Sequence, residues 1–132
     1  MKKEIARTIT YLKKRNKILF LTTSNRWSGQ HEKAKSTLLA YKLAELVGKE
    51  KVQVIEVPEL IIFTCEGNVS SQSGNNCGVK DAILKDNKKN PSGLHRCWAS
   101  INNITDELWK ISKPLFESDA VVFFTSVRWG QT

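Results

Sequence analysis

The sequence predicts an α/β fold built on a parallel β-sheet, and three apolar runs carry that prediction. The runs at 17–22 and 52–57 flank a segment of helical periodicity, which gives the strand–helix–strand order of parallel sheets. The third run, Ala-Val-Val-Phe-Phe at 120–124, is uninterrupted by any polar residue. Continuous apolar runs are typical of parallel strands that are buried on both faces. We therefore expect these three segments to form one sheet.

Two helices are expected in the N-terminal part of the chain. Apolar residues at 5, 9 and 12 recur at helical spacing and predict an amphipathic helix over 4–15, before the first strand. A polar loop at 23–33 then leads into a second helix at 34–47, which ends at Gly48. The buried face of this second helix is expected to be its apolar stripe, formed by Leu38, Leu39, Leu43, Leu46 and Val47.

The segment after the second strand is less regular. We expect the apolar residues 60–63 to continue toward the core and the Ser-, Asn- and Gly-rich residues 64–78 to form a loop. A short helix is expected at 79–89, and the Asn-Pro-Ser-Gly sequence at 90–93 breaks it.

A last helix is expected before the third strand. Thr105 is a favourable N-cap, and Pro114 is expected to bend the helix. The residues expected to face inward are Leu108, Ile111 and Leu115. The chain is long enough for one domain with a real core, so we expect a single domain over 1–132. Within it, 1–16 is the N-terminal helix and 64–104 an irregular insertion.

The net charge of +8 admits two interpretations. Clustered lysines can drive nucleic-acid binding, because neutralising phosphates releases counterions. Here the basic residues form short groups at 13–15, 49–51 and 85–89, where cations offset helix dipoles or lie in polar connectors. A positive field that attracts small phosphate-bearing ligands fits this scatter better, and nucleic-acid binding remains the less favoured alternative.

Several features favour a cytoplasmic location and no membrane association. No apolar stretch approaches the roughly 20 residues that span a bilayer. The N-terminus begins an amphipathic segment instead of the apolar core of a signal peptide. Three cysteines at loose spacing make no disulfide framework, which favours a reducing compartment.

A metal site is a further hypothesis, raised by Cys65, Cys77, His95 and Cys97. Structural zinc sites usually contain two cysteines separated by two to four residues, and no such pair exists here. The spacing also differs from compact iron–sulfur motifs. We therefore expect free thiols and no metal.

The loop after the first strand is a candidate anion site. It reads Thr-Thr-Ser-Asn-Arg-Trp-Ser-Gly at 22–29, and the next helix opens near Lys35, Ser36 and Thr37. Hydroxyls and a cation at a helix N-terminus suit an anion, because the free N–H groups and the helix dipole point the same way. A solvated loop, in which Ser36 or Thr37 only caps the helix, is an equally good interpretation. Neither the Walker spacing nor the Gly-x-Gly-x-x-Gly signature is present.

Two motifs resemble a known family. The Ser-x-Arg motif at 24–26, in a hydroxyl-rich loop before a Ser/Thr-headed helix, resembles the phosphate loop of flavodoxin-like NAD(P)H-dependent FMN reductases, a group that includes quinone reductases and iron–sulfur flavoproteins. Thr-Ser-Val-Arg-Trp-Gly at 125–130 is similar to the family's Thr-Pro-Val-Tyr-Trp-Gly loop, with Ser126 replacing Pro and Arg128 replacing Tyr. The resemblance covers the chain after the first helix.

The resemblance implies a fold and a two-part FMN site. The fold would be a flavodoxin-like three-layer sandwich with sheet order 2-1-3-4-5, incomplete here because only strands 1 to 3 are present. The phosphate would be held by Ser24, Asn25, Arg26, Ser36 and Thr37. The isoalloxazine ring would be lined by Ser126, Val127, Arg128, Trp129, Gly130 and Gln131, with Trp129 covering one face.

The activity that the resemblance implies is that of an FMN-dependent NAD(P)H oxidoreductase. Hydride would pass from NADH or NADPH to bound FMN, and electrons from FMN to a quinone or another small-molecule acceptor. No catalytic side chain is required for this chemistry, and a homo-oligomer is expected. The alternative from another class is a non-catalytic flavodoxin-like binding or interaction module.

Overall fold

The computed structural model describes residues 2–24, 32–65 and 85–126. The chain divides into two compact units. We call Met1–Glu59 with Pro114–Thr132 the sheet unit, and Leu60–Lys113 the second unit.

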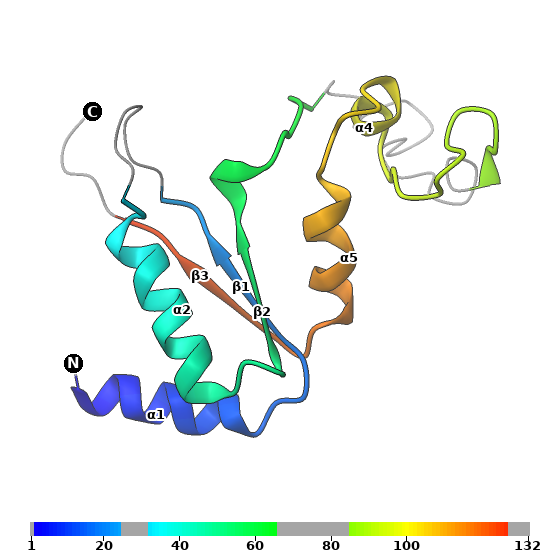
Figure 1. Cartoon of the computed structure of the whole chain (residues 1–132). Helices are drawn as coiled ribbons and strands as arrows, with labels where there is room; N and C mark the ends of the chain where they lie inside the picture. The colour runs from blue at the N-terminus through cyan, green and yellow to red at the C-terminus, as the bar shows by residue number, and fades with distance from the viewer. Residues whose placement is uncertain (1, 25–31, 66–84, 127–132) are drawn as a thin grey trace, which may run out of the picture. The chain divides into compact units, whose positions relative to one another are not determined.

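The sheet unit has alternating helices and strands, as the sequence predicts. Its elements in chain order are α1 (Lys2–Lys13), β1 (Ile18–Thr22), α2 (Lys35–Val47), β2 (Val52–Glu56), the 3₁₀ turn η1 (Val57–Glu59) and β3 (Ala120–Phe124) (Figure 1). Helix α2 ends at Gly48, whose φ of 131° lies in the region that favours glycine. The predicted helices and strands of this unit are therefore confirmed to within a few residues.

The three strands form one parallel sheet in the order β2-β1-β3. Ile18 at the start of β1 lies opposite Val52 and Ala120, and Thr22 at its end lies opposite Glu56 and Phe124. All five residues of β1 are buried, as expected for a central strand covered on both faces. The α/β class and the parallel sheet are thus confirmed.

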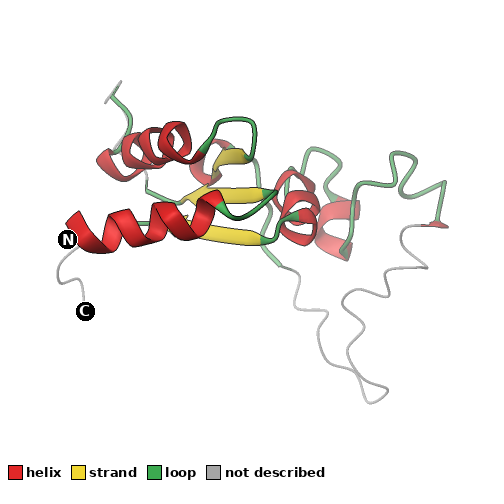
Figure 2. Cartoon of the chain, turned by 90° about the horizontal axis from the view of Figure 1, so that it is seen from below, coloured by secondary structure: helices red, strands yellow, loops and turns green. Residues whose placement is uncertain are grey.

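Helices α1 and α2 pack on the same face of the sheet (Figure 2). The phenyl rings of Phe20 and Phe124 lie 5.0 Å apart on that face in a tilted arrangement. Around them, α1 contributes Leu12, and α2 contributes a short row of mostly small side chains. The members of this row are Ala40, Ala44 and Val47.

The leucine stripe predicted as the buried face of α2 is wrong in part. Leu38, Leu39 and Leu46 are exposed, whereas Ala40 is fully buried and Ala44 nearly so. The small side chains let the helix approach the sheet closely, and the large aromatic rings of the strands fill the remaining space. The apolar residues surround so much of the helix that periodicity alone did not distinguish the two faces.

The described part of the second unit contains helix α4 and the start of helix α5, and it differs from expectation. Helix α4 (Trp98–Asn102) lies in the segment predicted to be irregular, and α5 (Trp109–Glu117) runs on into the sheet unit. The apolar residues at 61–63, expected to approach the core, are all exposed. The helix predicted at 79–89 lies mostly outside the described residues.

Asp106, and not the predicted N-cap Thr105, accepts hydrogen bonds from backbone N–H groups near the start of α5. One carboxylate oxygen of Asp106 accepts a hydrogen bond from Leu108 N (3.0 Å), and the other accepts one from Phe63 N (2.9 Å). Thr105 is exposed, and the helix begins only at Trp109. The fully buried Asp106 is the better acceptor because its charged oxygens bond two N–H groups at once. Pro114 lies inside the helix.

Membrane-spanning helices are absent from the described part of the chain. No helix there is both long enough and apolar enough to cross a bilayer.

The orientation of α2 predicts different effects of two substitutions. Ala40→Leu forces a larger side chain into a fully buried position, so it should lower the free energy of unfolding by about 1–3 kcal/mol. Leu39→Ala removes an exposed side chain and should change that free energy by less than about 0.5 kcal/mol. Urea denaturation followed by circular dichroism measures both. The reverse ranking would mean that the leucines face the sheet.

A second prediction concerns Asp119, which fixes the chain before β3. Its carboxylate accepts hydrogen bonds from Asn16 N and Lys17 N, both at 3.0 Å, and these bonds lower the pKa of Asp119. A carboxyl group with a lowered folded-state pKa stabilises the fold above its ordinary pKa, and this contribution is lost as the pH falls through the folded-state pKa.

Asp119→Asn should therefore lower the stability at pH 7 and flatten its decline at acidic pH. Urea titrations from about pH 7 to pH 3 measure this decline. Glu50→Gln, which removes one negative charge from an exposed side chain, is the control and should leave the slope unchanged. Equal slopes for Asp119→Asn and the parent chain would contradict the prediction.

Candidate functional site

Thr22, Glu56 and Phe124 form a row across the carboxyl end of the sheet. They lie opposite one another in the register, and neighbouring strands are about 4.8 Å apart. Side chains alternate between the two faces of a strand, and Phe20, two residues before Thr22, packs against α2. Thr22 therefore points to the α2 face of the sheet.

Thr22 is buried without a hydrogen-bond partner. Its exposed fraction is 0%, and among the described residues no group bonds its Oγ1. Leaving a buried hydroxyl unpaired costs about 1–3 kcal/mol, so such groups are rare in folded proteins. A ligand that accepts a hydrogen bond would satisfy it.

The N-terminus of α2 lies at the same end of the sheet (Figure 1). Its N-cap residue is Ala34, which has no side-chain oxygen, and its first turn contains no acidic residue. The N–H groups of the first turn have no acceptor within the helix. They therefore leave a partial positive charge that suits an anion.

The spacing of helix and strand brings Ser36 level with Thr22. Ser36 lies one turn before the buried Ala40, on the same helix face, about 6 Å nearer the N-terminus. Thr22 lies two residues beyond Phe20, about 6.6 Å nearer the strand end. Because Ala40 and Phe20 belong to one core cluster and the elements run in opposite directions, these two steps lead to the same level.

Three unpaired hydroxyls are thus gathered where β1 ends and α2 begins. Ser24 Oγ and Ser36 Oγ resemble Thr22 Oγ1, because both are buried and neither has a hydrogen-bond partner in the described part of the chain. Thr37, in the same helical turn, is 2% exposed. Hydroxyl and backbone donors around a helix N-terminus fit a phosphate group.

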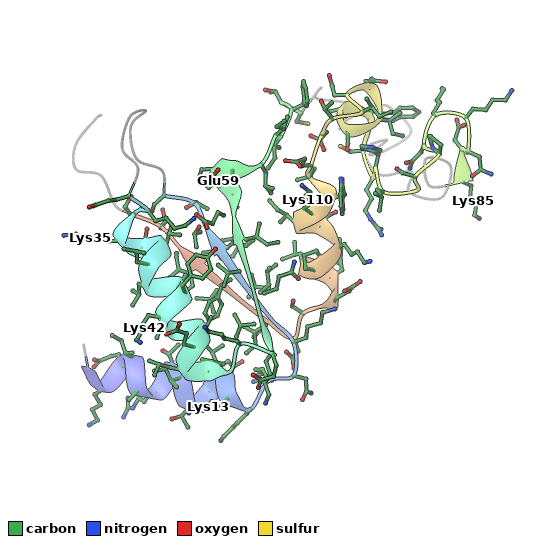
Figure 3. The ribbon with its side chains drawn as sticks, in the orientation of Figure 1. Lys13, Lys35, Lys42, Glu59, Lys85 and Lys110 are labelled. Carbon is green, nitrogen blue, oxygen red and sulfur yellow. The ribbon has the colours of Figure 1, made fainter. Side chains whose placement is uncertain are left out.

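A charged cluster borders these hydroxyls at the end of β2. Lys33 Nζ forms an ion pair with Glu56 Oε1, and the Tyr41 hydroxyl donates to the same oxygen at 2.7 Å. The Lys33 ammonium also lies 5.8 Å from the centroid of the Tyr41 ring. In Figure 3, Lys35 on α2 and Glu59 in η1 mark the same end of the sheet unit.

The hydrogen bonds in this cluster shift three pKa values. Partial burial works to raise the pKa of Glu56, but the bonds from Lys33 and Tyr41 outweigh it, so the pKa is lowered. The bond to Glu56 raises the pKa of Lys33 and that of Tyr41. Near neutral pH the cluster therefore consists of a carboxylate, an ammonium and a neutral phenol.

The described part of the predicted phosphate set is brought together at one place. Ser24, Ser36 and Thr37 lie at the carboxyl end of β1, and Ser126 is exposed two residues beyond the end of β3. The other predicted site residues lie outside the described residues; these are Asn25, Arg26, Val127, Arg128, Trp129, Gly130 and Gln131.

Four residues of this region were missed by the sequence analysis: Thr22 as an unpaired donor, and Lys33, Tyr41 and Glu56 as a cluster. Thr22 and Glu56 had a readable signal, because each is the last, polar residue of a strand. Their pairing in register, and the contacts of Tyr41 from a helix, depend on the tertiary structure.

The second unit contains a network of buried polar side chains that, unlike the hydroxyls of the sheet unit, are hydrogen-bonded to one another. Ser100 Oγ donates to Asp106 Oδ1 at 2.8 Å, so its only proton is used, and the Nδ1 of His95, 2.7 Å away, must donate to it. A serine nucleophile would need the opposite direction, with its proton passed to the histidine. This hydrogen-bonded network therefore stabilises the second unit and is not a catalytic triad.

Metal ligands do not converge in the described part of the chain. No three side chains of His, Cys, Asp or Glu come together there, and the described cysteines, Cys65 and Cys97, form no disulfide.

The unpaired Thr22 hydroxyl leads to a third prediction. Thr22→Val keeps the shape and removes the buried hydroxyl, so it should raise the free energy of unfolding of the ligand-free protein by about 1 kcal/mol. Thr22→Ser keeps the hydroxyl but loses a buried methyl group and should lower it by a similar amount, about 1 kcal/mol. Urea denaturation compares them. Destabilisation by Thr22→Val would mean that the hydroxyl has a structural partner.

Comparisons with known proteins give no relative from which a function can be transferred. No family model, no curated protein and no solved structure matches this chain. The function is therefore inferred from the contacts of the described residues and from the resemblance of the two loop motifs.

Proposed function

We propose that the chain binds FMN by its phosphate at the carboxyl end of β1 and acts as an FMN-dependent NAD(P)H oxidoreductase. The observation that carries the proposal is the set of buried, unpaired hydroxyls beside an uncapped helix N-terminus, with Thr22 fully buried. These hydroxyl and N–H donors lack acceptors, and a phosphate monoester can accept several hydrogen bonds at once.

The residues of the chain would bind and orient the phosphate. The N–H groups of the first turn of α2 and the hydroxyls of Thr22, Ser24 and Ser36 donate to its oxygens. Bonds from a neutral donor to a charged oxygen are strong, and more so in a partly buried site. Asn25 and Arg26 join the proposed set through the resemblance.

The loop after β3 would hold the flavin ring. Phe124 pairs with Thr22, so the chain leaves β3 at the same edge at which the phosphate would bind. The proposed ring contacts come from this loop, at 126–131. When bound, FMN supplies the redox chemistry, taking hydride from NADH or NADPH and delivering electrons to a small-molecule acceptor such as a quinone.

We also propose that the complete fold is of the flavodoxin-like type. The observed strand order is the one that begins a flavodoxin-like sheet, and the proposed protein is a three-layer sandwich of that type. We further propose a cytoplasmic homo-oligomer. If FMN binds without nicotinamide-driven reduction, the same site would be that of a non-catalytic binding module.

A comparison of FMN with riboflavin tests the phosphate site, because riboflavin lacks only the phosphate. We expect FMN to bind at least about tenfold more tightly, a difference of about 1.4 kcal/mol, as measured by quenching of flavin fluorescence. Thr22→Val combined with Ser36→Ala should reduce this preference several-fold and leave riboflavin binding unchanged.

Two results would contradict the proposal. Equal affinity for FMN and riboflavin would exclude a phosphate site, and absence of binding of either flavin would exclude a flavoprotein. With FMN bound, bleaching of the flavin absorbance by NADPH or NADH without oxygen tests the enzyme, and unchanged absorbance with both nicotinamides would leave only the binding module.

A further inference from the structure

We propose that Glu56 makes the phosphate site selective for a phosphate monoester whose neighbouring groups are hydroxyls, and that it rejects a second phosphate. The inference rests on the proposed phosphate site and adds to it the class of ligand that the site accepts. It is carried by the position of Glu56 and by the way in which its two oxygens are used.

Glu56 lies immediately beside the unpaired hydroxyls. It is opposite Thr22 in the register of neighbouring strands, and it follows Val54, whose side chain packs on the α2 face. Alternation along β2 therefore directs Glu56 to the same face as Thr22. The bond from Tyr41, a residue of α2, independently shows the same direction.

The two carboxylate oxygens of Glu56 are used differently. Lys33 and Tyr41 both bond Oε1, while Oε2 receives no hydrogen bond from the residues that the structure describes. The side chain is 17% exposed, so it is reachable from solvent without being free to move away. A carboxylate oxygen can only accept, so Oε2 favours hydroxyl donors and disfavours phosphate oxygens.

Lys33 would neutralise Glu56 without adding a net charge to the site. Its ammonium is held by Glu56 and lies near Tyr41, and Glu59 also acts on it electrostatically. One phosphate can then be bound by the neutral donors of Thr22, Ser24, Ser36 and the helix. A second phosphate next to it would lie near the carboxylates of Glu56 and Glu59, and Lys33 is already paired with Glu56, so like-charge repulsion disfavours it.

The experiment compares two flavins on the full chain. FMN carries one phosphate beside a hydroxylated chain, and FAD carries a second phosphate at the same place. Glu56→Gln keeps the shape and the acceptor oxygen for Lys33 and Tyr41 but removes the charge. We expect it to raise the affinity for FAD by roughly tenfold and to change that for FMN less than about threefold, as measured by fluorescence quenching.

A matched control separates local from overall charge. Glu45→Gln also removes one charge from an ion-paired glutamate, because Glu45 pairs with Lys42 and Lys49 near the other end of α2. This variant should leave the ratio of FMN to FAD affinity unchanged. Lys33→Met leaves Glu56 without its ammonium partner and should weaken FMN binding about tenfold.

Inorganic ions keep the inference independent of the flavin. Thermal denaturation with phosphate or pyrophosphate should show stabilisation by phosphate in the parent chain, and a gain for pyrophosphate only in Glu56→Gln. If FMN fails to bind but this pattern appears, the proposed cofactor is wrong and the selectivity stands. If Glu56→Gln leaves the FMN-to-FAD and phosphate-to-pyrophosphate preferences unchanged, the inference is overturned.

Discussion

The in-register pairing of β1 with a strand on each side is the constraint on which the sheet unit depends. Pairing on both edges satisfies the backbone of β1, and helices and neighbouring strands bury all its side chains. A slip of one residue would exchange the faces of β1, placing Leu21 toward α2 and Thr22 away from it. The same register that fills the core therefore decides which polar groups meet at the carboxyl end of the sheet.

Buried polar groups are usually hydrogen-bonded, and the unpaired hydroxyls at that end of the sheet depart from this pattern. Elsewhere the described part of the sheet unit mostly buries apolar groups, or satisfies polar ones as Asp119 satisfies Asn16 and Lys17; Arg15 Nε is the other buried side-chain atom there without a hydrogen-bond partner. At the junction of β1 and α2, buried oxygens are left unpaired and the helix begins at an alanine. Such a local departure from a consistent pattern is typical of a functional site, because stability is given up there for binding.

The sequence predicts the strands well because residues 18–22 and 120–124 are short, largely apolar runs, which are typical of parallel strands. β1 is buried throughout, whereas Phe123 in β3 is 65% exposed, so the apolar run predicts the strand but not its burial on both faces. The orientation of α2 is not predicted in this way, since alanine and leucine both count as apolar and only the packing of Phe20 selects Ala40 for the interior. In the second unit, Asp106 bonds Leu108 N next to the start of α5, but its bond from Phe63 N comes from a residue distant in sequence and could not be predicted from the local sequence.

The residues of the candidate site differ in how far the sequence predicts them. Ser24, Ser36 and Thr37 were predictable, because hydroxyl-bearing residues around a helix N-terminus are a local pattern. The part played by Glu56 was not, because an acidic residue at the end of a strand marks only its position, and its role follows from its neighbour in the register. The sequence does not distinguish Lys33 from the other cations of this basic chain, because its ion pair with Glu56 depends on the tertiary structure.

That pairing changes the meaning of the chain's net charge of +8. Lys33, one of the cations nearest the proposed phosphate, is neutralised by Glu56, and Glu59 lies close enough to act on it as well. The described donors to the phosphate are then neutral hydroxyls and backbone N–H groups, whose strength depends on direction and burial more than on long-range attraction. The overall positive charge would draw anionic ligands toward the protein in general, whereas the arrangement at the end of β1 would decide which of them remains bound.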